Sequence, residues 1–263
     1  TTEIYTLSLH DALPIFYKHS SMKSDDSLNG VLLVDKGPDM TSHDVVAVAR
    51  RCLRTKKIGH CGTLDPMATG MLILVIGTGT KLQDLLMSED KEYTGSLKLG
   101  VTTSTQDREG EVLEEKPVPA FTADEIQAAF DAYKGDFYQT PPMVSAVKID
   151  GVPLYKLARQ GREVERKPRF VRVYDAQITR AEPPDVDFRV VCSKGFYVRT
   201  YAHDIGQKLG CGAHLTALLR TRSGHFKFQP GNHTNFGALK EGRRDEVLAA
   251  MMSLYDVSKL RGA

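Results

Sequence analysis

Residues 59–70 read GHCGTLDPMATG, and the apolar run MLILVI follows directly at residues 71–76. Three glycines and one proline within this stretch predict an irregular, tightly turned loop rather than a helix or a strand. The apolar run predicts a buried strand. Asp65 lies inside the loop, where the edge of a rigid strand would hold a single carboxylate in place. From the loop alone, Asp65 is either a reactive acid or the cap of a turn, since Asp-Pro often begins turns.

The composition is that of an ordinary soluble protein with one large domain or two modest ones. The chain has 263 residues, of which 41% are hydrophobic, so it is long enough to bury a sizeable core. Its longest apolar run, residues 71–76, is far shorter than the roughly 20 residues of a membrane span. The 4 cysteines form no Cys-x-x-Cys pair, which argues against a zinc site or a disulfide framework. We therefore expect a cytoplasmic protein with no metal and no membrane partner.

The net charge of +2 averages over unequal regions. Residues 50–57 (RRCLRTKK) are basic and contain no acid, and residues 156–172 carry a clear excess of basic over acidic side chains. Such clusters are either solvated faces or contacts for a polyanion.

The first predicted elements begin at residue 30. Residues 1–29 show no sustained periodicity and are interpreted as a non-native or disordered leader, in which residues 1–21 resemble translated sequencing-adapter DNA. A buried strand is expected at residues 30–36. Thr41, with Asp44 three residues later, predicts the capped start of a helix that ends in the first basic cluster. Residues 93–101 alternate as a half-buried strand does.

The second half of the chain mixes strands and helices without a strict alternation. Thr122 and Glu125 predict a capped helix that stops near Gly135. Residues 138–170 contain no long periodic element and are interpreted as an insertion that projects from the core. Strands are expected at residues 171–178 and 186–192, then a helix to about residue 209, and a last helix at about residues 245–254. The fold class predicted is mixed α+β, with a largely antiparallel sheet flanked by helices.

Four residues are candidates for a shared site: Lys36, Asp65, Tyr93 and Arg199. The sequence has no Walker A loop, no Gly-x-Gly-x-x-Gly, no His-Glu-x-x-His and no Gly-x-Ser-x-Gly. NTP hydrolysis, dinucleotide redox chemistry, zincin proteolysis and the α/β-hydrolase reaction therefore lack their usual signals.

Collinear sequence blocks resemble the TruB family of tRNA pseudouridine synthases. They cover residues 30–225, and they are GVLLVDK at 30–36, TSHD at 41–44, GHCGTLDP at 59–66, KEY at 91–93, PPMVSAVK at 141–148, GFYVRT at 195–200 and AHLTALLR at 213–220. The resemblance implies a pseudouridine synthase fold over residues 30–225 with a thumb loop at 138–170. It also implies a helical tail at 226–263 that lacks the PUA-type domain of longer relatives.

The implied reaction is the isomerisation of uridine to pseudouridine in the T-loop of tRNA, at tRNA position 55, without a cofactor. Asp65 matches the family's catalytic aspartate, Arg199 the arginine that pairs with it, and Tyr93 the active-site tyrosine. Substrate-binding roles are implied for His60, Lys36, Tyr197 and Leu218. Contacts to the RNA backbone are expected from Arg159, Arg162, Arg166, Lys167 and Arg220.

The sequence departs from the family pattern at residues 36–38, where Lys-Gly-Pro replaces the usual Lys-Pro-x-Gly, and this affects the role expected of Lys36. The expected partner is the T-arm stem-loop of tRNA, bound by a monomer that needs no protein partner. Two alternatives are a tRNA-binding or folding helper that does not depend on catalysis, and the guide-RNA-dependent branch of the same family.

Overall fold

The computed structural model describes residue 25 and residues 27–262, and within them the chain forms a mixed α+β fold, as predicted. Its main sheet has ten strands in this described part, eight of them in the order β14-β1-β3-β12-β4-β11-β10-β7, with β2 paired to β3 and β13 to β12. The strands are β1 (Gly30–Lys36), β2 (Ile58–Cys61), β3 (Thr69–Ile76), β4 (Lys91–Leu99), β7 (Gly135–Gln139), β10 (Arg169–Glu182), β11 (Asp185–Cys192), β12 (Ala213–Ser223), β13 (Phe226–Lys227) and β14 (His233–Asn235).

Helices flank the sheet, and two small hairpins lie outside it. The helical segments are α1 (Ser42–Leu53), the 3-10 helix η1 (Gly77–Leu82), α2 (Gln83–Met87), α3 (Ala123–Asp131), α4 (Leu154–Ala158), α5 (Val198–Lys208), α6 (Phe236–Lys240), α7 (Arg244–Ala249) and α8 (Leu254–Leu260). The hairpins pair β5 (Val101–Thr103) with β6 (Val112–Glu115) and β8 (Lys148–Ile149) with β9 (Val152–Pro153). No helix in the described residues is both long and apolar enough to cross a bilayer.

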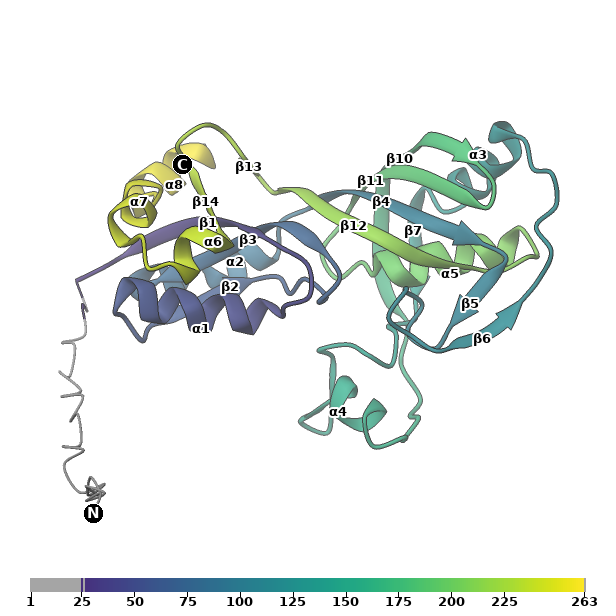
Figure 1. Ribbon diagram of the computed structural model, residues 1–263, viewed down its shortest axis with the longest axis horizontal. Helices are drawn as coiled ribbons and strands as arrows, with labels where there is room; N and C mark the ends of the chain where they lie inside the picture. The colour runs from purple at the N-terminus through teal and green to yellow at the C-terminus, as the bar shows by residue number, and fades with distance from the viewer. Residues whose placement is uncertain (1–24, 26, 263) are drawn as a thin grey trace, which may run out of the picture.

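The sheet has two halves, which meet where β3 runs parallel to β12 (Figure 1). Most neighbouring strands are antiparallel, whereas this seam is parallel and pairs only Leu219 with Thr69 and Arg220 with Gly70. Gly70 has φ +92°, and a Cβ there would lie 2.5 Å from the carbonyl oxygen of Arg220. The close approach of the two strands therefore requires glycine at this position.

Local capping signals predicted two helix starts correctly. Thr41 and Asp44 form a reciprocal capping box on α1, and Thr122 and Glu125 form one on α3. The α3 helix ends at Asp131, before the expected stop near Gly135.

Two expectations about secondary structure were wrong. The stretch 59–70 is not loop throughout, because β2 continues to Cys61 and β3 begins at Thr69, which leaves residues 62–68 as the loop. His60 and Cys61 pair with β3, and backbone pairing outweighs the turn preference of the neighbouring glycines. The single helix expected at residues 245–254 is instead α7 and α8, interrupted where Met252 bonds through its backbone to Val31.

The expected leader lies mostly outside the described residues, which exclude residues 1–24 and 26. Asp25 forms an ion pair with Arg244, with 2.6 Å between Oδ2 and Nη2. The Asn29 side chain accepts a hydrogen bond from the backbone of Thr78. Contacts with the fold therefore start before Gly30.

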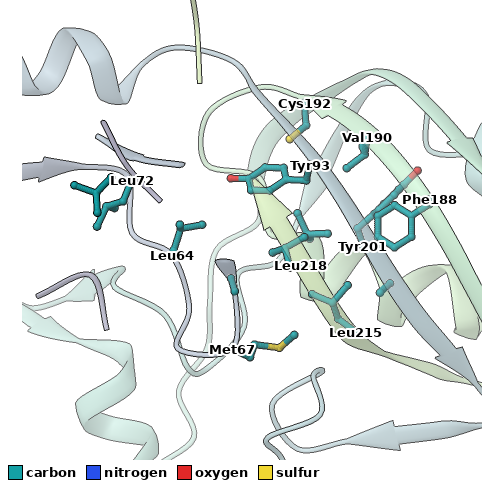
Figure 2. Close-up of a cluster of buried hydrophobic side chains, with 14 of the residues drawn as sticks. Leu64, Met67, Leu72, Tyr93, Phe188, Val190, Cys192, Tyr201, Leu215 and Leu218 are labelled. Carbon is teal, nitrogen blue, oxygen red and sulfur yellow. The ribbon is translucent and has the colours of Figure 1, made fainter. Parts of the chain in front are cut away.

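The main hydrophobic core holds the loop at residues 62–68 in place. Leu64 and Met67 are 2% and 3% exposed, so the loop is anchored by a buried side chain on each side of Asp65. Both belong to the same buried cluster as Leu72 and Leu218, and Figure 2 shows Leu64 between those two, with the Tyr93 hydroxyl pointing from β4 toward the side where Leu64 lies. Burial of two such side chains contributes roughly 1.5–3 kcal/mol each, enough to fix the loop on the sheet.

Residues 140–168 leave the main sheet between β7 and β10 and carry α4 at their outer end (Figure 1). They have a small apolar centre of their own, because Leu154 and Leu157 are buried. This segment corresponds to the insertion predicted at residues 138–170. The four cysteines are buried free thiols, and burial raises the pKa of Cys61 to about 12, so it packs as an apolar side chain in a second core cluster.

Candidate active site

A cavity of about 250 Å³ lies beside the seam, between the loop at residues 62–68, β4, β12 and the start of α5. Six of the residues predicted from the sequence line it: Asp65, Tyr93, Tyr197, Arg199, Leu218 and Arg220. Segments far apart in the chain therefore supply one cavity.

A larger hollow of about 470 Å³ shares Leu218 with this cavity. It contains the carboxylate of Asp187, which is already bound by Arg180 and Ser96. We assign the chemistry to the smaller cavity, because it is more enclosed by buried charged groups.

Arg199 forms a two-point ion pair with Asp65. Its Nε donates to Asp65 Oδ2 at 2.8 Å, and its Nη2 donates to Oδ1 at 3.2 Å. The arginine side chain is 3% exposed and the aspartate 33%, so a fixed guanidinium orients a carboxylate that still reaches the cavity. The first turn of α5 places Arg199, and the backbone oxygens of Thr105 and Val144 accept its remaining bonds.

A second carboxylate, missed in the sequence, contacts the same guanidinium. Asp107 is 3% exposed, and its Oδ2 lies 3.5 Å from Arg199 Nε. Its other oxygen accepts bonds from the Thr105 hydroxyl and from the backbone of Glu109. The sequence signal was weak, since an acid in a polar turn is usually a turn residue. Asp107 contacts Arg199 at the same Nε as Asp65 and balances part of its charge.

Two tyrosines form part of the cavity wall. Tyr93 is 8% exposed, and burial raises the pKa of its hydroxyl, which is opposed by the nearby guanidinium of Arg220. Burial also raises the pKa of Tyr197. Both phenols are therefore protonated at neutral pH and offer a ring face and an O–H donor.

Lys36 binds the backbone of the loop at residues 62–68 and does not line the cavity. Its side chain is fully buried, and its Nζ donates to the backbone oxygens of Gly37, Pro66 and Ala68, at 2.9, 3.1 and 2.5 Å. Burial lowers its pKa from 10.5 to about 8. The carboxylates of Asp65, Glu109 and Asp39 oppose that shift, and the charge of Arg220 adds to it. Lys36 thus positions Asp65 through the carbonyls on its C-terminal side.

Replacing Lys36 by Met is expected to change how stability depends on pH. Because the folded-state pKa, about 8, lies below the ordinary value of 10.5, the unfolded chain holds the Lys36 proton more tightly. The free energy of unfolding of the wild type should therefore gain about 3 kcal/mol relative to the variant as pH rises through this window. Urea titrations at pH 7 and pH 10 measure the difference, and parallel pH dependences would contradict the lowered pKa of Lys36 in the fold.

Two further positioning residues escaped the sequence reasoning. The fully buried Ser42 hydroxyl accepts a bond from Leu64 N at 2.9 Å and contacts the carbonyl oxygen of Leu64, which ties the start of α1 to the loop. The Gln139 amide bonds both backbone groups of Tyr197, at 2.8 and 3.0 Å, and so ties β7 to the start of α5. Neither residue type indicates a site in a sequence.

His60 lies outside the cavity lining. Its ring packs edge-on against His43, with centroids 5.2 Å apart, at the surface where α1 meets β2. Burial, with smaller contributions from His43 and Arg220, lowers its pKa to about 4, so His60 is neutral at neutral pH. A role of His60 in RNA binding stays a prediction. In that role His60 would contact the RNA as a neutral ring and not as a cation.

The expected RNA contacts divide into exposed and buried groups. Arg159, Arg162 and Lys167 are exposed, whereas Arg166 is half-buried and donates to the carbonyl oxygen of Pro141 and to Glu163. Arg220 departs most from the expectation, because it is 1% exposed and donates to the carbonyl oxygens of Met71 and Gly62. Its place in the strand that forms the seam turns it toward the cavity rather than the surface.

The site is built without a cluster of metal-ligating side chains. Among the residues that the structure describes, no group of three or more His, Cys, Asp or Glu is arranged to hold a metal ion. The chemistry available in the cavity is that of an oriented carboxylate, two phenols and several cations.

Two family models match the chain over adjoining regions. They are described as TruB family pseudouridylate synthase (N terminal domain), at residues 50–198, and tRNA pseudouridylate synthase B C-terminal domain, at residues 199–253. All the residues found around the cavity from Asp65 to Arg220 fall within them.

Curated relatives with the name tRNA pseudouridine synthase B include one from Opitutus terrae, 61% identical over 200 residues, which covers 76% of this chain and 83% of that protein. Another, from Syntrophotalea carbinolica, is 53% identical and covers 76% of this chain and 65% of that protein. A solved structure of a Cbf5-Nop10-Gar1 complex matches with a TM-score of 0.67 at 30% identity, over 88% of this chain and 62% of that one.

Proposed function

The chain belongs to the TruB family of pseudouridylate synthases, and on that premise we propose that it isomerises uridine to pseudouridine in the T-loop of tRNA, at tRNA position 55. The proposal includes the substrate named for the curated relatives. The observation that carries it is the ion pair of Asp65 and Arg199 at a cavity closed by Tyr93.

The proposed chemistry begins at the Asp65 carboxylate. Each of its oxygens accepts one bond from Arg199 and keeps a further lone pair for the cavity. The carboxylate attacks the sugar as the N1–C1′ bond breaks, or it accepts a proton from the sugar. The freed uracil turns within the cavity. C5 then bonds to C1′ as the bond from C1′ to Asp65 breaks, or as Asp65 returns its proton to the sugar. The C5 proton moves to N1, so atoms and charge balance without a co-reactant.

Tyr93 and Leu218 support the base in this scheme. The Tyr93 ring offers a stacking face, and its protonated hydroxyl is a donor for a uracil oxygen. Leu218 is 7% exposed and gives the cavity an apolar wall that excludes water. Stacking of this kind contributes about 1–3 kcal/mol per base, which offsets the few kcal/mol needed to extrude a base from a folded RNA.

We propose that the segment at residues 140–168 closes on the RNA. The backbone oxygen of Val144 accepts a bond from Arg199 at 2.8 Å, so this segment is joined directly to the catalytic ion pair. Its exposed cations Arg159, Arg162 and Lys167 form no ion pair within the described part of the chain, which leaves them for phosphate contacts.

Neutralising Arg159, Arg162 and Lys167 together by Gln is expected to reduce the salt dependence of tRNA binding. Each lost phosphate contact should flatten the slope of log K against log salt by about 0.7–0.9, so the triple variant should lose about 2–3. Binding titrations between about 50 and 200 mM salt measure the slope. The matched control neutralises the exposed Lys208, Lys227 and Lys240, outside this segment. Equal slopes in both variants would mean that the cluster is a solvated face.

The direct test maps pseudouridine in unmodified tRNA after incubation with the purified chain. The expected result is one new pseudouridine, at position 55, and the same product on a bare T-arm stem-loop without added protein. Binding without product would favour a folding helper. Product only in the presence of a guide RNA and partner proteins would favour the guide-dependent branch, which the likeness to Cbf5 complexes makes a fair competitor.

We further propose that the chain acts as a monomer in a reducing cytoplasm. The buried free thiols of all four cysteines are the supporting observation. Light scattering of the chain with and without a T-arm stem-loop tests the monomer, and a stable dimer in either state would contradict it.

A further inference from the structure

Two buried cations line the catalytic cavity without a carboxylate partner. Lys91, at the start of β4, is 6% exposed, and Arg220, on β12, is 1% exposed. The Lys91 ammonium donates to the carbonyl oxygens of Met87 and Glu89, and Arg220 donates to those of Met71 and Gly62. Within the described part of the chain, neither cation forms an ion pair, in contrast to Arg199.

Burial of two cations without carboxylate partners lowers the stability of the fold, which indicates that they bind a ligand. Buried charges are ordinarily paired, because an unpaired charge loses its hydration without an equivalent gain. An ammonium has three N–H donors and a guanidinium has five, so both groups keep donors beyond their carbonyl contacts. Both line the cavity together with Tyr93, which follows Lys91 by two residues on β4.

The charge of the cavity as a whole favours an anion. Its lining contains three cations, Lys91, Arg199 and Arg220, and one carboxylate, Asp65. Arg199 and Asp65 already neutralise each other through a two-point ion pair. The net positive charge at the cavity therefore comes from Lys91 and Arg220. A negatively charged oxygen placed there would be desolvated and would meet preorganised donors.

We propose that Lys91 and Arg220 form an oxygen-anion subsite that binds the extruded uridine nucleotide during the reaction. The inference rests on the proposed function. Two oxygens have the required charge. One is a carbonyl oxygen of uracil, which becomes anionic when the N1–C1′ bond breaks and leaves its electron pair on the base. The charge is lost again when that pair forms the C5–C1′ bond. The other is a phosphate oxygen beside the target nucleotide.

The protonation state of Lys91 fits this role. Burial and, to a smaller extent, the charge of Arg220 lower its pKa to about 8, while the Cys192 thiol, Asp90 and Glu89 oppose the shift. Lys91 therefore carries its charge at neutral pH and loses it as pH rises above 8. For the wild type, the rate constant for pseudouridine formation at saturating RNA should fall above this pH. A variant without the Lys91 ammonium should not show this fall.

The test compares Lys91→Met with Lys98→Met, the same change at an exposed position of the same strand. Single-turnover formation of pseudouridine on a T-arm stem-loop should slow about 100-fold or more in Lys91→Met and less than about twofold in the control. Lys91→Arg should recover at least part of the loss. The melting temperature of Lys91→Met should equal or exceed that of the wild type, since an unpaired buried charge is removed.

The source of the anion is distinguished with a stem-loop in which the phosphate 5′ of the target is a neutral methylphosphonate. A phosphate ligand predicts weaker binding of this RNA by the wild type but not by Lys91→Met. If the ligand is a uracil oxygen, the methylphosphonate should leave RNA binding by the wild type and by Lys91→Met unchanged. Lys91→Met alone should then be slow at saturating RNA. Either result supports the subsite.

Other results would overturn the subsite. A Lys91→Met rate within twofold of the wild type contradicts it, as does a slow variant that melts early and is not rescued by Lys91→Arg. A wild type that forms no pseudouridine would instead refute the proposed function, so the two failures are separable.

Discussion

The Asp65→Asn variant is expected to bind tRNA as the wild type does and to release almost no tritium from 5-tritiated uridine. The amide keeps the shape of the side chain but removes the charge that attacks the sugar or accepts its proton. Loss of a group that acts as nucleophile typically costs about 10⁴–10⁶-fold in rate. The fold should survive, because Leu64 and Met67 anchor the loop and Asp107 still contacts Arg199.

The matched control is Asp35→Asn, which removes a carboxylate exposed on β1. Its rate should stay within about twofold of the wild type, in line with other surface changes. Normal tritium release by Asp65→Asn would refute the assignment of Asp65, and lost binding would mean that the variant reports on folding rather than on chemistry.

Replacing Arg199 by Met should have the largest effect on stability. The change leaves Asp65 and Asp107 near each other with no cation between them, and it frees the carbonyl oxygens of Thr105 and Val144. Breaking a buried ion pair from one side costs about 3–5 kcal/mol, so the free energy of unfolding should fall by about that amount. Catalysis should also fall by about 10³-fold, because the carboxylate loses its orientation.

The control for this variant is Arg189→Met, which also removes an arginine that bridges two carboxylates. Arg189 contacts Glu92 and Asp175 at 2.6 and 2.9 Å, but its side chain is 33% exposed. Solvent screens such pairs, so the loss should stay near 1 kcal/mol or below, with little change in rate. Urea unfolding measures both variants, and equal losses would mean that burial of Arg199 adds nothing to its ion pairs.

Local signals in the sequence predicted the local structure well. The capping boxes at Thr41 and Thr122 depend on side chains three residues apart, and both are present. The end of β2 was missed, because its pairing with β3 is not visible in the glycines and histidine of residues 59–62. Pairing between strands depends on register, which a single segment does not specify.

The cavity residues were found through ordered motifs rather than through their spacing. The sequence did not indicate Asp107, Ser42 or Gln139, because each acts on a residue far from it in the chain. Arg220 was assigned to the surface for a similar reason. Its burial follows from the pairing with Gly70 across the seam, and nothing near either residue predicts that pairing.

The seam between β3 and β12 also determines how the enzyme could be divided. The strands of one half, β4 to β12, form a continuous segment of the chain, whereas the other half is built from β1 to β3 together with β14. Asp65 belongs to the interrupted half and Arg199 to the continuous one, so each half carries one side of the catalytic ion pair. A single cut in the turn before β4 would give two fragments, one with Asp65 and one with Arg199. Produced separately, we expect each to be inactive alone, and activity to return only when β3 and β12 pair again.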